Sequence, residues 1–283
     1  PLRVVIGLHK AAPLAFFWAL IILFFIGTAA PALGGSIDLA PTQEKIAWDI
    51  LKSFVDKKRN PDAIIRHIRE PGYVQHNVKM GDGRSGYLAA RSNLPDGLYV
   101  NRILTFSDDN HVVVHVEYPR TLGIDIYRFE GTEAVEHWDC IFMKPIGRSS
   151  NTVPLLGWGV EAEDLDKTAE NKKLIADLTS RNLGAASTEH VDRCIDTNFL
   201  PQNTWLRMVK AIHEWRTGIV YRKTHKILGK GSLVMTLREG SIGGTPTAFC
   251  DIFRLKNSRV LERWSVRDTI PPREYWKNDN GKF

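Results

Sequence analysis

The sequence predicts an α+β protein in which helices cover one face of a curved antiparallel sheet, with this unit occurring twice. In both halves, amphipathic helical segments come first and strand-like segments follow. The stretches DIYRFEGTEAVEHWD and DIFRLKNSRVLERWS share Asp, Ile, Arg, Glu and Trp at one offset of 126 positions (251 − 125 = 126). A constant offset across several elements indicates an internal duplication.

The first half begins with three predicted helices. Residues 42–60 place apolar side chains on one face at a spacing of 3.6 residues. Asn60 and Pro61 then supply a cap and a first helical residue for a second helix. A third, short helix is expected over residues 83–94.

Three strands are predicted next, over residues 111–118, 123–129 and 134–142. They are rich in β-branched and aromatic residues and are bounded by turn residues. Strands joined by short turns form an antiparallel meander, so we expect one sheet with the helices on one face.

The second half repeats this order of elements. Helices are expected over residues 171–183, 187–199 and 203–212, and strands over 232–237, 248–255 and 260–266. A Pro-, Gly- and Ser-containing connection at residues 144–168 separates the first domain, 41–143, from the second, 169–283, which ends in a polar tail.

Residues 1–35 differ from the rest of the chain. Arg3 and Lys10 precede an uncharged apolar run that ends in small residues. A cleaved signal peptide, an uncleaved membrane anchor and a buried core helix all remain open. The first two predict a secreted or membrane-anchored protein with its domains outside the cytosol and no other membrane contact.

Composition narrows the function classes further. The 283 residues are 43% hydrophobic and carry a formal charge of +6, which is typical of a folded protein. No dense basic block interleaved with aromatic residues occurs, so nucleic acid is not an expected partner. Three cysteines allow at most one disulfide.

Polar side chains that suit proton transfer gather in the first half. Alternation along a strand places Asp125 with Tyr127, and His137 with Asp139, on a shared face. A buried carboxylate can exchange a proton near neutral pH, and a neighbouring His or Tyr can stabilise an oxyanion. Structural roles for each residue remain open, and Trp138 and Trp264 are expected in the core.

The segments YVQHN, DIYRF and EHWD resemble SnoaL-like proteins of the nuclear transport factor 2-like superfamily, in particular the predicted aldol-condensation enzymes. The match covers residues 42–142, and the tail also matches, although it is attached to the second copy. Val78 departs from the family pattern, where proline is usual, and FEGTEA lacks the usual glycine turn.

This resemblance implies two tandem cone-shaped α+β barrels, each with a pocket between helices and sheet. It also implies acid/base chemistry without a cofactor, of the isomerase, aldol cyclase or dehydratase type, on a small carbonyl compound. The expected catalytic residues are Asp125, His76, His137 and Asp139. The expected pocket residues are Tyr73, Asn77, His115 and Tyr127.

Other functions are compatible with the same residues. The pocket could bind a small molecule without catalysis, or the fold could serve as a protein-interaction scaffold. A transition metal held by His76, His115, His137 and Asp125 is a further alternative, but these residues lack the close spacing of a metal motif. We therefore expect no metal and no cofactor.

The second copy is expected to have lost this chemistry and to cover the first sheet as the partner in an internal pseudo-dimer. Asp251 is retained at the position of Asp125. The titratable residues are replaced as follows: His76 by Gln202, His115 by Thr236, His137 by Arg263 and Asp139 by Ser265.

Overall fold

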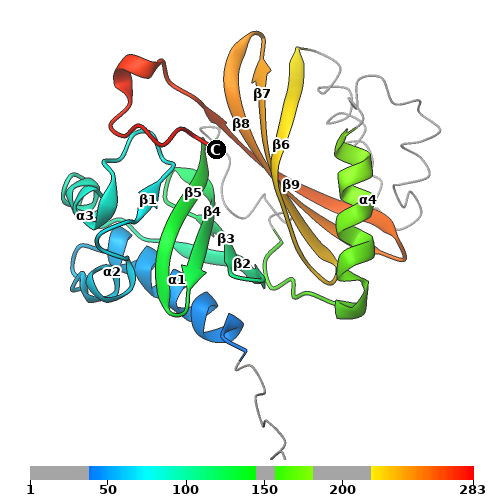
Figure 1. Ribbon diagram of the computed structural model, residues 1–283, viewed down its shortest axis with the longest axis horizontal. Coiled ribbons are helices and arrows are strands. Elements are labelled where there is room, and N and C mark those ends of the chain that lie inside the picture. The colour runs from blue at the N-terminus through cyan, green and yellow to red at the C-terminus, as the bar shows by residue number, and fades with distance from the viewer. Residues whose placement is uncertain (1–37, 145–156, 181–217) are drawn as a thin grey trace, which may run out of the picture. The chain divides into compact units, whose positions relative to one another are not determined.

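The computed structural model describes residues 38–144, 157–180 and 218–283. From Asp38 onward the chain forms one compact unit of mixed α and β structure. Its strands make two sheets, one of five strands in the order β1-β5-β4-β3-β2 and one of four in the order β6-β7-β8-β9 (Figure 1).

The first sheet and its helices confirm the predicted order of elements in the first half. The helices are α1 (Ala40–Val55), α2 (Asp62–His67) and α3 (Gly83–Ser92). The strands are β1 (Val74–Gln75), β2 (Asn101–Asp108), β3 (His111–Glu117), β4 (Thr121–Glu130) and β5 (Glu133–Met143).

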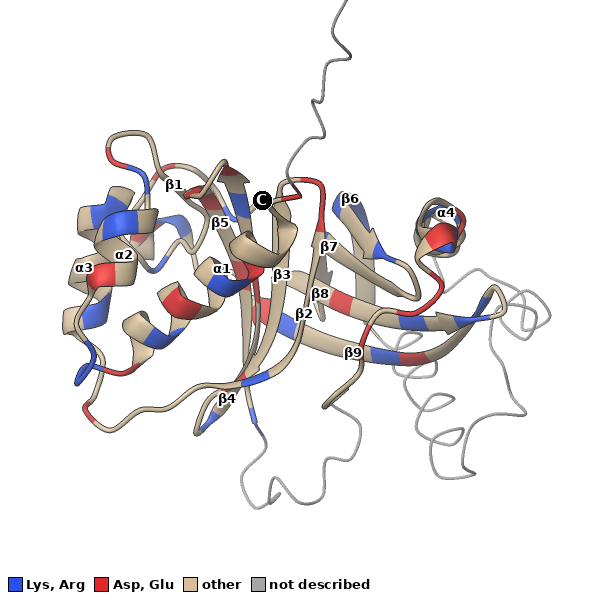
Figure 2. Ribbon diagram, turned by 90° about the horizontal axis from the view of Figure 1, so that it is seen from below, with Lys and Arg blue, Asp and Glu red and all other residues tan. Residues whose placement is uncertain are grey.

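Helices α1 to α3 pack on one face of this sheet because their apolar sides meet a row of inward strand residues. Ile50 and Leu51 of α1 and Ile64 of α2 are buried against Val112 and Val114 of β3. The opposite side of α1 is charged, and Lys45 and Lys52 both pair with Asp49. Figure 2 shows basic and acidic residues distributed over these helices.

The second sheet is an antiparallel meander of β6 (Ile219–Lys230), β7 (Leu233–Ile242), β8 (Thr245–Lys256) and β9 (Arg259–Thr269). Helix α4 (Thr168–Ser180) buries Ile175 and Leu178 against Val234 and Phe253 of this sheet. The helix predicted over residues 171–183 is thus found in part, and those predicted over 187–199 and 203–212 lie outside the described residues.

The strand pairings of the two sheets are equivalent. Asp125 pairs with Asp139 as Asp251 pairs with Ser265, and both β4–β5 and β8–β9 carry a β-bulge at equivalent positions. The predicted replacement of His115 by Thr236 is wrong. Thr236 pairs with Asp251 as Val114 pairs with Asp125, so Thr236 corresponds to Val114. The counterpart of His115 is therefore Leu237.

Strands β1, β2 and β6 were not predicted. Strand β1 has two residues and joins β5 in parallel, which gives no period to detect. Strands β2 and β6 occupy an edge of each sheet, and several of their positions are exposed, so their apolar alternation is incomplete.

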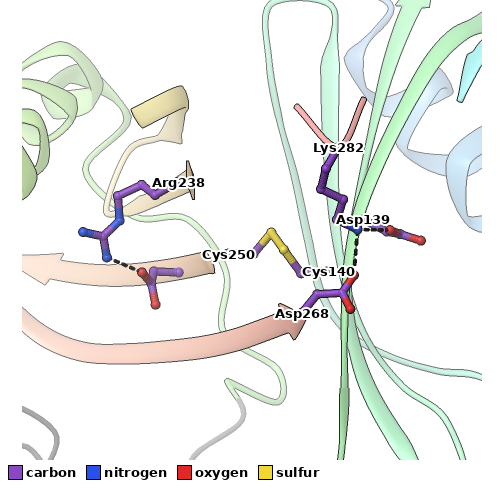
Figure 3. The surroundings of a disulfide bond; sticks show 7 residues. Asp139, Cys140, Arg238, Cys250, Asp268 and Lys282 are labelled. Atoms are coloured by element: carbon purple, nitrogen blue, oxygen red, sulfur yellow. Dashed lines mark hydrogen bonds and ion pairs between the residues drawn. A yellow bond between two sulfur atoms is a disulfide. The ribbon is translucent and has the colours of Figure 1, made fainter. Parts of the chain in front are cut away.

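The faces of the two sheets that point away from the helices share one apolar core. Trp138 and Ile126 of the first sheet and Trp264 and Ile252 of the second belong to this cluster, which confirms the prediction for both tryptophans. A disulfide between Cys140 of β5 and Cys250 of β8 links the sheets, with Cα atoms 6.1 Å apart (Figure 3).

The predicted leader, residues 1–35, lies outside the described residues. Within residues 38–144, 157–180 and 218–283, no helix is both long enough and apolar enough to span a bilayer.

Candidate functional site

The candidate site lies between the first sheet and its helices, where β4 and β5 present Asp125 and His137 to each other. The two residues are diagonal neighbours, and Nε2 of His137 lies 3.1 Å from Oδ1 of Asp125. Both side chains are buried, with residue exposures of 3% and 2%. This contact is therefore shielded from bulk water.

Gln75 fixes the tautomer of His137. The backbone N–H of Asn77 donates to Oε1 of Gln75 at 2.8 Å, so the amide oxygen is directed toward the histidine. Nδ1 of His137 lies 3.0 Å from the same oxygen and must carry a proton to donate to it. One further proton is then shared between Nε2 of His137 and the carboxyl group of Asp125.

The surroundings make Asp125 a ready proton acceptor or donor. Burial raises its pKa above the usual 3.8, and this effect exceeds the opposing hydrogen bond and charge of His137. The hydroxyl of Tyr118 donates to Oδ2 of Asp125 at 3.3 Å. Gly123 makes room for this contact, because a Cβ there would lie 2.9 Å from the Tyr118 ring.

The pKa of Asp139 is shifted in the opposite direction to that of Asp125. Burial opposes its ionisation, but the charge of Lys282 and that of His137 outweigh this and lower its pKa. Lys282 Nζ donates to Asp139 at 3.0 Å and to Asp268 at 2.6 Å (Figure 3). Asn77 Nδ2 donates to Asp139 at 2.6 Å. The pKa values of these two neighbouring carboxyl groups are thus shifted in opposite directions.

Four tyrosines enclose the Asp125–His137 pair. The rings of Tyr127 and Tyr87 lie 4.5 and 6.1 Å from the imidazole, and their hydroxyls are 2.8 Å apart. Burial raises the pKa of Tyr73, Tyr87, Tyr118 and Tyr127, so these side chains remain neutral hydrogen-bond donors.

Two polar atoms beside the pair are left without partners. Oη of Tyr73 and Nε2 of Gln75 are buried and form no hydrogen bond within the described part of the chain. A buried donor without an acceptor is costly and uncommon, and it points to a place that a ligand oxygen or a water would fill.

Segment 277–283 of the tail closes the site from the second half. Asn278 donates to the carbonyls of Asn77 and Met80, and Asn280 donates to that of Gln75. Together with Lys282, these contacts fix the loop that carries Gln75 and Asn77. The second half thus contributes side chains to a site on the first sheet.

Two of the histidines predicted for the site lie elsewhere. His115 pairs with Ile124 and faces the core between the sheets, because Val114 and not His115 shares the face of Asp125. His76 stacks on Trp138, with Nε2 2.9 Å from Glu136, on the other face of β5. The structure gathers the other candidates: Tyr73, Asn77, Asp125, Tyr127, His137 and Asp139.

A three-histidine metal site is not assembled, since His76 and His115 are separated from His137 in this way. Asp125, His137 and Asp139 do bring potential ligand atoms within 4.8 Å of one another. These atoms already have partners, because His137 contacts Gln75 and Asp125, and Asp139 accepts from Lys282 and Asn77. The ammonium of Lys282 supplies a positive charge at this cluster.

A surface pocket of about 340 Å³ opens next to the tail. It is lined by residues 79–81, by α3 and the residues that follow it, and by Lys277. The residues of the Asp125–His137 pair do not line it.

Three contributors were missed by sequence reasoning. Gln75 lies within the YVQHN segment but was not assigned a role, although an amide beside a histidine is a usual tautomer partner. Tyr118 directly follows a predicted strand and reaches Asp125 only because position 123 is glycine. Lys282 is 143 positions from Asp139, and no local pattern connects them.

Comparisons with known proteins give distant structural similarities. No protein-family model matches this sequence, and the search of curated proteins returns no match. An LEH-like epoxide hydrolase from M. tuberculosis is similar to 36% of this chain over 85% of its own length, with 19% identity and a TM-score of 0.26. An Ntf2-like protein involved in plasmid conjugation is similar to 80% of this chain over 95% of its own, with 12% identity and a TM-score of 0.23.

Proposed function

We propose that this chain is a SnoaL-like protein of the nuclear transport factor 2-like superfamily with two copies of the unit, and that the first copy catalyses proton transfer on a small carbonyl compound without a cofactor. The observation that carries this proposal is the buried Asp125–His137 pair, which shares one proton beside two unpartnered donors. The reaction is of the isomerase, aldol cyclase or dehydratase type.

Asp125 is the group that moves the proton. Its carboxylate takes a proton from the carbon next to the substrate carbonyl, and the C–H electron pair becomes the enolate. The raised pKa of Asp125 suits both this step and the return of the proton to another atom. His137 orients the carboxyl group. It also holds the shared proton on Nε2 while Asp125 accepts a proton from the substrate.

Tyr73 and Gln75 are the donors that would stabilise the enolate oxygen. Oη of Tyr73 and Nε2 of Gln75 form no hydrogen bond to any described residue, so their donor capacity is available to a ligand. Fixed donors in a site shielded from water stabilise developing negative charge more strongly than water does. Tyr127 and Tyr87 form the apolar wall against which the substrate would pack.

The remaining features support a protein that works outside the cytosol. Disulfides persist mainly in oxidising compartments, and Cys140 and Cys250 form one here. The apolar leader in residues 1–35 fits export or anchoring in a membrane. The second copy acts as an internal partner that covers the first sheet and supplies Lys282 to its site.

Deuterium exchange tests the proton transfer without knowledge of the natural substrate. Purified protein is incubated in D₂O with a panel of small ketones, aldehydes and β-keto acids, and exchange of hydrogens on the carbon next to the carbonyl is followed by NMR. We expect accelerated exchange for at least one structural class. Asp125→Asn should reduce it by about 100-fold or more, because the proton acceptor is lost.

Asp49→Asn is the matched control, since Asp49 lies on the charged side of α1 and pairs with lysines there. It should leave the exchange rate unchanged. Equal exchange by wild type and Asp125→Asn would remove the assignment of Asp125. Binding of a panel compound without any exchange would favour a small-molecule binding protein instead.

A further inference from the structure

His76 joins the loop of the candidate site to segment 277–283 of the tail. Nδ1 of His76 lies 2.9 Å from the carbonyl oxygen of Gly281, which is 205 positions away in the sequence. Nε2 lies 2.9 Å from Oε1 of Glu136, and only 5% of His76 is exposed. Figure 1 shows the tail, in red, beside β1 and β5, where these contacts form.

Both atoms that the His76 ring contacts are hydrogen-bond acceptors. The Gly281 carbonyl has no proton to donate. Burial opposes ionisation of Glu136, but the hydrogen bonds from Arg128 and His76 outweigh it and lower its pKa, so Glu136 is a carboxylate. A neutral histidine has one donor and one acceptor nitrogen and could donate to only one of the two oxygens. The geometry therefore points to an imidazolium ion, with both ring nitrogens protonated.

The nearest neighbours of His76 act on its charge in both directions. Its ring stacks on Trp138, with centroids 4.8 Å apart and planes inclined by 7°, and the face of an indole attracts a cation. Arg128 of β4 donates to Oε2 of Glu136 at 2.7 Å, and half-buried Lys226 of β6 has its Nζ 3.5 Å from the Trp138 centroid. These two cations oppose a second proton on His76, whereas Glu136 favours it. Histidine is also the side chain that changes charge between about pH 5 and pH 8.

Other titratable groups face the same region from β3, β6, the loop and the tail. Burial lowers the pKa of His111 on β3 to about 4, so it is neutral near pH 7. Lys282 of the tail is shared by two carboxylates, and Asp82 accepts hydrogen bonds from the loop and the tail. His225 of β6 stacks on the tail and lies 3.1 Å from Glu239, a contact that a neutral imidazole can make. Among these described histidines, only the contacts of His76 require two protons.

Loss of one proton from His76 would act on the tail. The Glu136 carboxylate holds its proton more strongly than the Gly281 carbonyl does, so Nδ1 is the nitrogen that becomes deprotonated. Its lone pair would then face the Gly281 oxygen at 2.9 Å, and two acceptors at this distance repel each other. Gln75 and Asn77 flank His76 in the sequence, so a change in this contact reaches the loop of the candidate site.

We propose that doubly protonated His76 is a positioning residue that holds the tail on the loop of the candidate site, and that loss of one proton weakens this hold. The contacts stabilise the tail fully below about pH 6, and this contribution is lost as the pH rises toward about 8. The tail supplies Lys282 to the site and the loop supplies Gln75, so pH regulates the site through His76. That regulation rests on the function proposed for Asp125, whereas the hold on the tail does not.

NMR of the full chain tests the protonation and the hold on the tail without a substrate. The ring-nitrogen shifts of His76 are measured at about pH 5.5 and about pH 8.5, together with hydrogen exchange of the Lys277 amide, which donates to the Val78 carbonyl at 2.8 Å. We expect two protonated ring nitrogens at the lower pH and one at the higher. Protection of the Lys277 amide, corrected for the intrinsic effect of pH on exchange, should fall by about 3- to 10-fold, as expected for the loss of one hydrogen bond.

Glu136→Gln separates the charge of His76 from its packing. A neutral His76 can accept at Nε2 from the introduced amide and still donate at Nδ1 to Gly281, while the amide oxygen accepts from Arg128. Protection of the Lys277 amide should therefore no longer depend on pH in this variant. A role of His76 in packing alone would not produce this result.

Two histidine variants complete the series. His76→Gln carries no second charge at any pH, so its Lys277 amide should be as weakly protected at about pH 5.5 as that of wild type at about pH 8.5. His67→Gln is the matched control, because the His67 ring contacts the Thr132 carbonyl instead of the tail. It should keep the pH dependence of wild type.

Regulation of the site is measured separately, by the deuterium exchange assay. The ratio of the wild-type rate to the Glu136→Gln rate cancels the titration of Asp125, and it should fall by about 3- to 10-fold between the two pH values. If wild type exchanges no compound of the panel, the proposed function and its regulation are both removed, and the NMR result still decides the role of His76.

The contrary NMR results are defined for wild type and for the variant. A single protonated ring nitrogen on His76 at about pH 5.5 would overturn the imidazolium ion. Equal protection of the Lys277 amide at both pH values in wild type, or a wild-type pH dependence in Glu136→Gln, would overturn the hold on the tail.

Discussion

The helix-facing sides of the two sheets carry different charges on the same backbone register. In the first, Asp125 contacts the imidazole of His137 and has a raised pKa, because burial outweighs that contact. In the second, Asp251 lies between Arg238 and Arg263. There, burial opposes ionisation, but the two arginines outweigh it and lower the pKa of Asp251 to about 2.

This difference shows that one aspartate position can be a proton carrier or a fixed anion, depending on its partners. An imidazole can give up its proton, which makes His137 a compatible partner for the proton transfer proposed at Asp125. A guanidinium stays charged at all ordinary pH values, so Asp251 remains a carboxylate. Retention of aspartate at both positions therefore does not mean the same role.

The largest expected effect is on stability when Asp251 is neutralised. Asp251→Asn removes the carboxylate that Arg238 and Arg263 share, which should destabilise the fold by about 3–5 kcal/mol. Asp125→Asn should cost less than about 1.5 kcal/mol, because an amide can replace a carboxyl group that shares its proton. Urea unfolding of the two variants measures both values, and equal costs would contradict the comparison.

Removal of the disulfide tests how strongly the link between the two sheets stabilises the fold. Cys140 and Cys250 are 110 residues apart, so their cross-link closes a long loop in the unfolded chain. Replacement of both by serine should cost about 2–5 kcal/mol. Thermal unfolding with and without reductant gives the same comparison in wild type. An unchanged midpoint on reduction would show that the bridge contributes no stability.

The tail lysine tests whether the second half supports the site of the first. Lys282→Met leaves Asp139 and Asp268 buried without their shared cation, which should cost about 2–4 kcal/mol and raise the pKa of Asp139. Lys277→Met is the control, because its side chain is exposed in the same segment. Equal unfolding free energies for the two variants would remove the proposed role of Lys282.

Acid unfolding should report the lowered pKa of Asp251. The folded chain has a pKa of about 2 there against a usual 3.8, so the ionised group contributes about 2 kcal/mol above pH 4. That contribution is lost as the pH falls from about 4 to 2. Asp125 acts in the opposite sense, since a raised pKa makes its ionised form unfavourable in the fold. Asp251→Asn should therefore reduce the loss of unfolding free energy between about pH 4 and pH 2, and Asp125→Asn should not have this effect.

Much of the fold could be predicted because the elements that carry it have clear periods. The apolar side of α1 and the β-branched runs of β3 to β5 follow spacings of 3.6 and 2 residues. The edge strand β2 lacks that contrast, and the two residues of β1 are too few to show a period.

The candidate site was predictable only in part. The alternation along a strand shows which side chains share a face, but it does not show which residues they contact. It grouped Asp125 with Tyr127 and His137 with Asp139, and the β4–β5 register brings these pairs together. The resemblance implied that His115 lines the pocket, but the register of β3 against β4, which the sequence does not reveal, places it on the other face of the sheet. Lys282 reaches Asp139 only through the tertiary fold.

The most direct test of the difference between the two sheets is an NMR titration of the aspartate side-chain carboxyl carbons in folded protein. Asp125→Asn and Asp251→Asn assign the two signals. The account predicts that the Asp125 signal titrates above the usual pKa of 3.8 and the Asp251 signal near pH 2. Titration of both carboxyl groups at the same pH, or of Asp125 below Asp251, would contradict it.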